Sequence, residues 1–396
     1  MPTQRQLFLN HLAQTSPSPL LLEMVSAEGI YMTDVEGKKY IDLISGIGVS
    51  NVGHRHPKVV EAIKNQVDHH LHVMVYGEFV QSPQVKLAEA LAKTLPSHLN
   101  STYLVNSGSE AIEGAMKLAK RYTGRSEIIS CHNAYHGSSH GALSLSGSEI
   151  FKQNYRPLVP GISHIQFGNI DDLGAITEDT AAFIVETVQG EAGVITGSDK
   201  YWKEARKKCN ETGTLLVLDE IQCGFGRTGK LWAFEHSGIE PDVVVSAKGM
   251  GGGMPIGCFI ADQKVMNVFT ENPILGHIST FGGHPVSSAA ALATLQAIEE
   301  ENLLAGVSQK EKLFHQLLKH PAIKEIRSKG LMIAVEFESY DVLKPIIDKA
   351  IEMGIVTDWF LFNDRSMRIA PPLIITEEEI KKACKIILEA IEATLS

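Results

Sequence analysis

Short runs of branched apolar residues, each ending in a polar residue, are the clearest pattern in the chain. Leu215–Leu218 runs directly into Asp219, and Val243–Val245 leads to Lys248. Similar runs lie near residues 103, 128 and 183. Each run is too short for a helix and lacks polar alternation, so each predicts a strand that is buried on both faces.

Helical periodicity fills the segments between these strands. From Pro57 the apolar residues Val60, Ile63 and Val67 fall on one face, and residues 200–211 predict another helix. Strands that alternate with helices are typical of an α/β fold, doubly wound on a mostly parallel central sheet. In open sheets of this kind, ligands bind outside the carboxyl ends of the strands.

The pattern changes near Leu295, where helices begin to dominate and strands become short. Helices are expected at 286–299, 308–318, 342–353 and 377–395, and strands at 331–337 and 367–370. Near the amino end, residues 30–32 and 40–43 also predict short strands. We therefore expect a large domain at residues 54–294 and a smaller α+β domain built from both chain ends, residues 1–53 with 295–396.

Composition narrows the class of protein. The 396 residues are 44% hydrophobic and 21% charged, which suits two globular domains. The net charge of −10 is spread along the chain, so no nucleic-acid surface is predicted. The five cysteines are widely spaced and form no CxxC pair, which favours reduced thiols. With no signal peptide and no run long enough to span a membrane, we expect a cytoplasmic protein.

Glycines crowd around both charged strand ends. They lie at 224, 226 and 229 after Asp219, and at 249 and 251–253 after Lys248. Glycine allows the backbone to approach a ligand closely. A carboxylate and a lysine at two such strand ends suggest a charged pair facing one small molecule, although each alone could be a solvated loop residue.

A second candidate site is the segment Asn106–Ala111, where small polar residues and glycine open a helix that continues to about Arg121. Free N–H groups at the start of a helix suit a phosphate. Ser107 and Glu110 also fit a capping box. Both interpretations can hold, because capping and anion binding use the same helix end.

Two other patterns suggest ligands but lack a required part. His69 and His72 could share a helical face, but no further ligand is spaced to complete a zinc site, so no metal is predicted. The segment Gly224–Lys230 fits glycine-rich nucleotide loops, but Leu231 replaces the magnesium-binding serine or threonine. Four residues also separate its first glycine from Asp219, whereas in the dinucleotide pattern the first glycine follows the strand directly. A plain glycine-rich turn is the alternative.

Taken together, these segments resemble the class III aminotransferases, which are pyridoxal-phosphate enzymes of fold type I. That family includes enzymes acting on ornithine, N-acetylornithine and 4-aminobutyrate. The resemblance runs from about Gly29 to the C-terminus and rests on ordered blocks. The blocks are Ser45–Gly48, Gly53–Pro57, Asn106–Ala111, Tyr135–Gly137, Gly190–Gly193, Asp219–Gln222, Gly224–Gly229, Lys248, Thr280–Gly283 and Arg368.

The resemblance implies roles around pyridoxal 5'-phosphate. Lys248 would bind the cofactor covalently and, once displaced, would be the base that moves a proton. Asp219 would keep the pyridine nitrogen protonated, so that the ring can accept charge. The other contacts would come from Gly108 and Ser109 to the phosphate, Tyr135 to the ring face and Gln222 to the ring hydroxyl.

Three residues would act on the substrate or on a second subunit. Thr280 matches a residue that reaches the phosphate in the neighbouring subunit, which implies a homodimer. Arg368 would bind the α-carboxylate of an α-amino acid, and Glu191 would neutralise that arginine when an ω-amine enters.

The chain departs from the family in two places. Family members acting on these substrates usually have arginine after the aromatic-x-Gly segment, where this chain has Ser138 and Ser139. Serine cannot form a charged bidentate contact, which puts dicarboxylic acceptors such as 2-oxoglutarate in doubt. Arg55 or Arg365 could compensate, or the acceptor could be pyruvate. Glu78 could face a distal amine or could equally be a structural ion-pair partner. A second, smaller departure is His284, which stands where asparagine is usual.

We therefore expect a homodimeric, cytoplasmic aminotransferase that works by a ping-pong route. The amino group would pass from an ω-amino acid of the ornithine, acetylornithine or 4-aminobutyrate type to a 2-oxo acid. The alternatives are a racemase, aminomutase or lyase of the same fold, since Lys248 and Asp219 serve all of these, and a non-catalytic protein that binds the cofactor.

Overall fold

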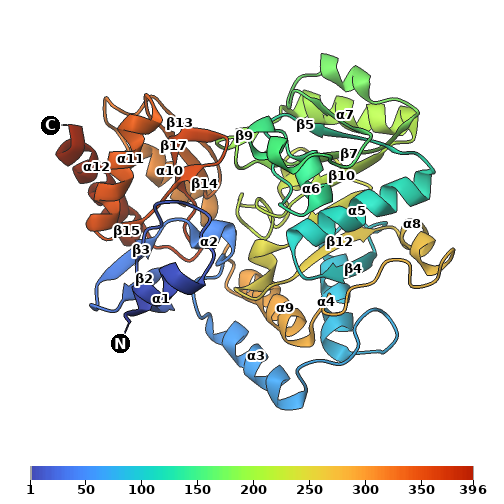
Figure 1. The fold of residues 1–396 in the computed structure, drawn as a ribbon, viewed down its shortest axis with the longest axis horizontal. Helices are drawn as coiled ribbons and strands as arrows, with labels where there is room; N and C mark the ends of the chain where they lie inside the picture. Colours follow the sequence, from blue (N-terminus) through green and yellow to red (C-terminus); the bar gives the residue numbers. More distant parts are fainter. Residues whose placement is uncertain (1, 396) are drawn as a thin grey trace.

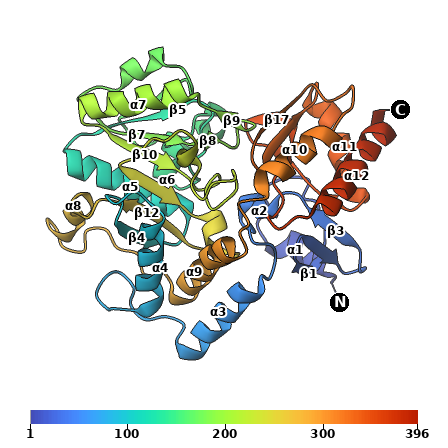
Figure 2. The ribbon, with the colours of Figure 1, turned by 180° about the vertical axis from the view of Figure 1, so that it is seen from behind.

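The computed structural model describes residues 2–395, and the chain forms two lobes (Figure 1). The larger lobe holds the middle of the sequence. The first and last segments, blue and red in Figure 1, lie together in the smaller lobe, and Figure 2 shows the same division from behind.

A seven-stranded sheet forms the centre of the larger lobe. Its order is β4 (Ser101–Val105), β12 (Gly257–Ala261), β11 (Val243–Ser246), β10 (Leu215–Asp219), β7 (Thr180–Glu186), β5 (Glu127–Cys131) and β6 (Ile162–Ile165). All neighbours pair in parallel except β12, which is antiparallel to β11 and β4. The predicted α/β class and mostly parallel sheet are confirmed. The sequence reading missed β6 and β12.

Apolar side chains cover both faces of this sheet, which explains the continuous apolar runs. Every residue of β7 and β10 is buried. Leu216 and Leu218 join the core on one face with Trp202, whereas Val217 joins a second core with Ile112 on the other face. Alternate residues of a strand point to opposite faces, so a strand between two helical layers must be apolar at every position.

Helices form the layers over the sheet. The helix α5 (Gly108–Thr123) lies on one face with α6 (His140–Leu145). The other face carries α4 (Ser82–Lys93), α7 (Asp199–Thr212) and α9 (Pro285–Glu300). Against α9 packs α3 (Pro57–His69), the helix predicted from Pro57. His284, unexplained by the sequence, caps α9, because its Nδ1 accepts the N–H of Val286 at 3.3 Å.

The smaller lobe combines two four-stranded sheets with three helices. One sheet contains β1 (Met24–Glu28), β2 (Tyr31–Asp34), β3 (Lys39–Asp42) and β15 (Ile355–Val356). The other contains β13 (Glu325–Lys329), β14 (Met332–Glu336), β17 (Asn363–Ile369) and β16 (Trp359–Phe360). The helices are α10 (Val307–Leu317), α11 (Tyr340–Glu352) and α12 (Glu377–Leu395).

The two chain ends share one core in this lobe. The strands β3 and β15 pair in parallel, and Ile41 packs in the same apolar cluster as Val335 and Ile387. This shared cluster supports the division into residues 54–294 and 1–53 with 295–396, which stays a prediction. The helix α9 runs continuously through residue 294.

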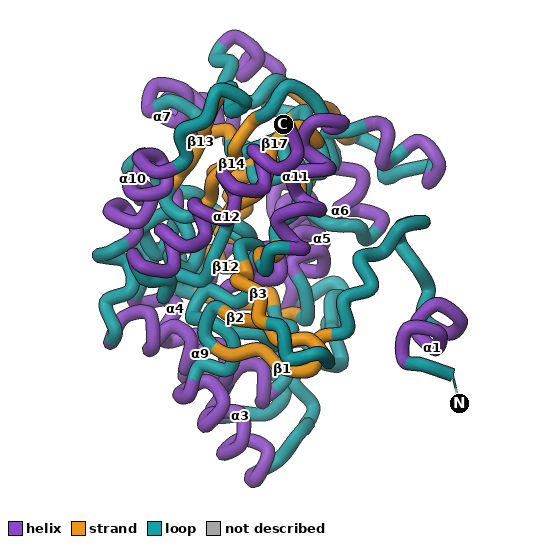
Figure 3. The backbone as a smooth tube through the Cα atoms, turned by 90° about the vertical axis from the view of Figure 1, so that its left-hand side faces the viewer, coloured by secondary structure: helices purple, strands orange, loops and turns teal. Residues whose placement is uncertain are grey.

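The remaining segments are short or peripheral. In Figure 3 the helix α1 (Gln4–His11) stands apart from the body, and none of its residues is buried. The other short α-helices and strands are α2 (Ser45–Gly48), α8 (Gln263–Met266), β8 (Val188–Gln189) and β9 (Ile195–Thr196). Within residues 2–395, no helix has the length and apolar character needed to cross a bilayer.

The contact between α5 and the sheet gives a prediction for stability. A Cβ at Gly114 would come within 2.2 Å of the Phe259 ring, so Gly114→Ala should lower the free energy of unfolding by about 1–3 kcal/mol through overpacking. Thermal unfolding would measure it. Gly174→Ala is the control, since a Cβ there meets nothing within 4 Å. A Gly114→Ala protein as stable as the control would contradict this account of the packing.

Candidate active site

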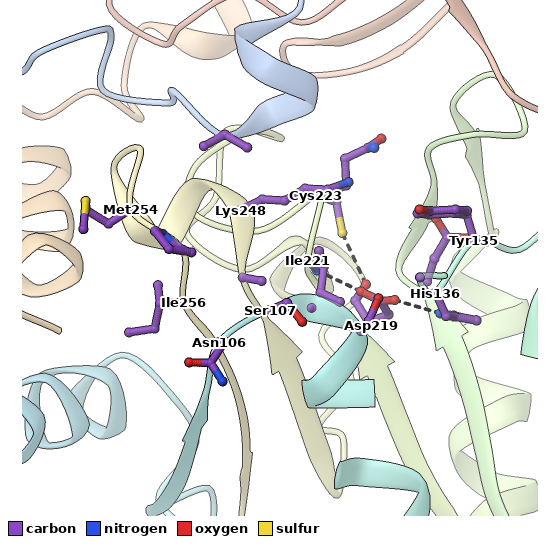
Figure 4. Close-up of a pocket in the computed structure, with 18 of the residues that line it drawn as sticks. Asn106, Ser107, Tyr135, His136, Asp219, Ile221, Cys223, Lys248, Met254 and Ile256 are labelled. Atoms are coloured by element: carbon purple, nitrogen blue, oxygen red, sulfur yellow. Dashed lines mark hydrogen bonds and ion pairs between the residues drawn. The ribbon is translucent and has the colours of Figure 1, made fainter. Parts of the chain in front are cut away.

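A cavity of about 390 Å³ lies outside the carboxyl ends of the central strands (Figure 4). Six of the residues predicted from the sequence line it. They are Gly108, Ser109, Tyr135, Asp219, Gln222 and Lys248. The strands β5, β7, β10 and β11 end at this edge because they run in parallel, so the polar residues that follow them meet in one place.

Asp219 is the last residue of β10 and is only 3% exposed. Its Oδ2 lies 2.7 Å from His136 Nδ1, and its Oδ1 accepts the N–H of Ile221 at 2.9 Å. The other ring nitrogen of His136 lies 3.2 Å from the Ser130 hydroxyl. Figure 4 shows the contacts from His136 and Ile221 converging on the carboxylate. Because both oxygens are held, the position of the carboxylate is fixed.

Lys248 follows β11 and begins a short turn with a positive φ of 41°. A non-glycine residue rarely adopts this left-handed conformation, and such strain is concentrated at functional sites. Burial lowers the pKa of the Lys248 amine, although the negative charge of Glu191 opposes that shift. A larger share of the amine is therefore neutral near pH 7 than for an exposed lysine.

The start of α5 faces the same cavity. Gly108 and Ser109 are its first two residues, and the N–H groups of a first helical turn have no acceptor within the helix. The Ser107 hydroxyl accepts the N–H of Glu110 at 3.2 Å, so Ser107 caps the helix. The predicted capping box is only half formed, because the Glu110 carboxylate accepts the N–H of Asn106 at 2.8 Å and not that of Ser107. The Ser109 hydroxyl accepts the N–H of Ser138 at 3.2 Å. This end of the cavity suits a phosphate group.

Tyr135 and Gln222 complete the predicted lining. The Tyr135 hydroxyl lies 3.3 Å from the Ser138 hydroxyl, so the tyrosine ring is held near the first turn of α5. Gln222 donates through Nε2 to Glu191 Oε1 at 3.0 Å. The cavity lining is therefore hydrogen-bonded directly to the carboxylate of Glu191.

Glu191 and Arg368 form a buried ion pair next to the cavity. Arg368 Nη1 and Nη2 donate to the two Glu191 oxygens at 2.8 and 2.9 Å. Burial alone would raise the pKa of Glu191, but the guanidinium outweighs it and lowers the pKa to about 2. The pair joins the loop after β8 to the strand β17, so it connects the two lobes.

Thr280 does not lie with the other predicted residues. It is exposed, lies outside the cavity lining, and its carbonyl contacts His72 Nε2 at 2.9 Å. Of the proposed substitutes for the missing arginine, Arg55 is exposed and Arg365 pairs with Glu336 at 2.9 Å; neither lines the cavity. Glu78 is likewise exposed and outside the lining.

The glycine-rich segment after Asp219 lies between the lobes. Arg227 within it is fully buried and donates to the carbonyl oxygen of Leu331 at 3.2 Å and to the carbonyl oxygen of Pro371. The loop therefore joins the lobes, and the structure supports the reading of a structural turn.

Sequence reasoning missed the roles of two buried residues in the site, His136 and Glu186. Glu186 pairs beside Asp219 in the sheet and accepts the N–H groups of Tyr135 and Gly190 at 3.1 and 3.2 Å. Burial, followed by the charge of Asp219, raises its pKa well above the usual value. Their positions at or just after strand ends were the available signal, because that is where the other cavity residues lie.

These residues fit pyridoxal phosphate. A helix start with free N–H groups suits the phosphate, and a fixed carboxylate suits a protonated pyridine nitrogen. A Cβ at Gly137 would come within 2.0 Å of the Ser109 hydroxyl, so the backbone there must be glycine for the turn to close against α5. An amine with a lowered pKa stands at the same cavity.

Comparison with known proteins supports the same cofactor assignment. The family model described as Aminotransferase class-III matches residues 12–391. An acetylornithine aminotransferase of Methanopyrus kandleri is 39% identical over 389 residues, covering 97% of each chain. A LysW-aminoadipate semialdehyde/glutamate semialdehyde transaminase of Sulfolobus acidocaldarius is 37% identical, covering 93% of this chain and 95% of its own.

A solved structure confirms the predicted fold type I. The ornithine aminotransferase from Toxoplasma gondii superposes with a TM-score of 0.91 and 30% identity, covering 98% of this chain and 93% of its own. That crystal is described as having partial occupancy of PLP at the active site. The chain belongs to the class III aminotransferase family and is a pyridoxal-phosphate-dependent aminotransferase.

Proposed function

We propose that this aminotransferase takes a terminal amino group from an ω-amino acid and passes it to a 2-oxo acid by a ping-pong route. The names of the relatives support a donor of the acetylornithine or ornithine type. The observation that carries the proposal is the closed pair between Glu191 and Arg368. With its guanidinium neutralised, the site suits an amine whose reacting carbon bears no carboxylate.

The acceptor requires the opposite state of the same pair. A 2-oxo acid carries a carboxylate next to its reacting carbon, and Arg368 can bind it only after Glu191 has moved away. One arginine thereby serves both half-reactions, first neutralised and then exposed. This exchange favours transfer between an ω-amine and an α-oxo acid over racemase, aminomutase or lyase chemistry, which needs no second substrate.

The residues around the cavity divide the chemical work. The chemistry that bound pyridoxal phosphate supplies is withdrawal of electrons from the substrate carbon. Asp219, fixed by His136 and Ile221, holds a proton at the pyridine nitrogen and so sustains that withdrawal. Lys248 moves the proton at the substrate carbon, and its lowered pKa leaves the amine free to accept it.

The choice of acceptor depends on Ser138. It lies at the end of the Tyr135–Gly137 segment, and its backbone N–H donates to Ser109. The cavity lining contains one lysine, Lys248, and no arginine; its histidine, His136, contacts Asp219, and the nearby Arg368 is already paired with Glu191. Apart from Lys248, which the cofactor would occupy, a second carboxylate therefore finds no unpaired cation within this lining, which favours pyruvate-like acceptors over dicarboxylic ones.

We further propose a homodimer. Exposed apolar side chains gather in two segments that touch each other. One segment contributes Leu71, Val73, Phe79 and Val80, and the other contributes Ile274, Leu275, Ile278 and Phe281. The two segments are joined by the contact between His72 Nε2 and the Thr280 carbonyl. An apolar surface of this kind is typical of subunit interfaces, and Thr280 within it could reach a neighbouring site.

A cytoplasmic location is also proposed. All five cysteines are free and buried, which suits a reducing compartment.

Replacing Lys248 tests its role as the base. Lys248→Ala should keep the cofactor through its phosphate and ring contacts but lose turnover by roughly 10³-fold or more, because no other group moves the proton. Initial rates and the absorbance of bound cofactor after gel filtration would measure both effects. Lys264→Ala, an exposed lysine, is the control. Near-normal turnover in Lys248→Ala would rule out the assignment.

Replacing Ser138 tests acceptor choice. Ser138→Arg should lower the KM for 2-oxoglutarate relative to pyruvate by roughly tenfold, because a guanidinium can form a charged, bidentate contact with the second carboxylate. Steady-state kinetics with both acceptors would measure the ratio. Ser138→Gln is the control, because its side chain is also longer than serine and donates hydrogen bonds but carries no charge. An unchanged ratio in Ser138→Arg would remove this explanation.

The apolar surface predicts the state of assembly. Sedimentation of the unaltered protein should give twice the mass of one chain, and Phe281→Asp should shift the population toward monomer by placing a charge in the interface. Tyr122→Asp, at a comparably exposed aromatic on α5, should leave the dimer intact. A monomeric unaltered protein would contradict the proposed homodimer.

A further inference from the structure

We propose that Asp358 is a positioning residue that anchors Arg368, so that an incoming substrate carboxylate exchanges with Glu191 alone. The proposal rests on the proposed function, in which Arg368 alternates between partners. It adds a residue that determines which of those partners is exchangeable.

The two carboxylates hold different edges of the guanidinium. Glu191 accepts from Nη1 and Nη2 at 2.8 and 2.9 Å. Asp358 Oδ1 accepts from Nε at 2.9 Å, on the other edge. A planar guanidinium presents these N–H groups in a fixed fork, so the outer edge, where Glu191 sits, is the one a substrate carboxylate can occupy.

Asp358 and Arg368 belong to one hairpin and cannot separate easily. The N–H of Arg368 donates to the Asp358 carbonyl at 2.8 Å, and the Thr357 hydroxyl donates to the Arg368 carbonyl at 2.6 Å. The guanidinium also lies over the Phe360 ring at 4.5 Å. Backbone pairing therefore keeps the Asp358 side chain next to Nε whatever happens at the outer edge.

Glu191 has no backbone hydrogen bond to Arg368 itself; its carbonyl accepts the N–H of Phe362, at the turn of the same hairpin, at 3.0 Å. It lies on the loop after β8, whereas Arg368 lies in β17, 177 residues away in sequence. The contacts of its carboxylate are with side chains and with the N–H of Leu361 at 3.0 Å. A rotation of one side chain can therefore release Glu191, while release of Asp358 would require the hairpin to open.

The anchor is sensitive to pH. Burial raises the pKa of Asp358 to about 6 despite the opposing charge of Arg368, and the charges of Glu191 and Asp42 add to the shift. Asp42 in turn contacts His54 at 2.8 Å. Asp358 is therefore charged at pH 7 and becomes neutral as the pH falls through about 6, which weakens its hold on Nε.

Kinetics of the two half-reactions test the anchor. Asp358→Ala should raise the KM for pyruvate roughly tenfold, the effect of losing a hydrogen bond to a charged group, with kcat changed much less. The KM for an ω-amine donor, N-acetylornithine, should stay within about twofold, since that half-reaction needs Arg368 only in its paired state.

A conservative variant separates anchoring from folding. Asp358→Asn keeps an oxygen that can accept from Nε but lacks the charge, so its KM for pyruvate should lie between those of the unaltered enzyme and Asp358→Ala. The KM of the unaltered enzyme for pyruvate should rise as the pH falls through about 6, and Asp358→Asn should lack that rise. Asp364→Ala, at an exposed aspartate of β17, is the matched control and should behave as the unaltered enzyme.

The outcomes distinguish failure of the anchor from failure of the proposed function. Equal losses in both half-reactions, or no change in Asp358→Ala, would overturn the anchor. Calorimetric titration of pyruvate into the holoenzyme and its variants measures carboxylate binding without turnover. If the unaltered enzyme transfers no amino group between these substrates but Asp358→Ala binds pyruvate more weakly, the proposed donor and acceptor are wrong and the anchor is supported. If Asp358→Ala binds pyruvate as tightly as the unaltered enzyme, the anchor is wrong.

Discussion

The parallel pairing of β10 with β7 and β11 sets where the charged groups of the cavity lie. It places Asp219 beside Glu186 and Val245 in the sheet, and Lys248 follows β11 after one intervening residue. Parallel strands deliver their carboxyl ends to one edge, so an acid and an amine distant in sequence face one cavity. Apolar layers on both faces keep that edge rigid and exclude water, which strengthens each charge interaction.

The balance between burial and neighbouring charges differs between the two halves of the site. At Lys248 it outweighs the neighbouring acids and lowers the pKa of the amine, which suits proton transfer. At Glu191 it is outweighed by Arg368, and the pKa falls to about 2, so the pair stays ionised. The first group is poised to change its charge during the reaction. The second is a fixed ion pair that changes only by exchanging partners.

The ion pair between Glu191 and Arg368 lies between the lobes, which explains why the site needs both lobes. Glu191 comes from the large lobe and Arg368 from the small lobe, whose strands are supplied by both chain ends. Arg227 joins the same two lobes through buried hydrogen bonds to backbone carbonyls. The substrate-binding arginine is therefore placed by tertiary contacts, while the groups that meet the cofactor are placed by one sheet.

The sequence by itself determined the strands β4, β5, β7, β10 and β11, the capped start of α5 and the charged residues that follow the strands, because apolar runs and helix starts are local signals. It missed β6, a half-exposed edge strand, and β12, which follows a glycine-rich loop. Only the tertiary structure brought His136 to Asp219, 83 residues apart, and Asp358 to the Nε edge of Arg368. Such pairings depend on the path of the chain and on the direction of side chains, which no local pattern encodes.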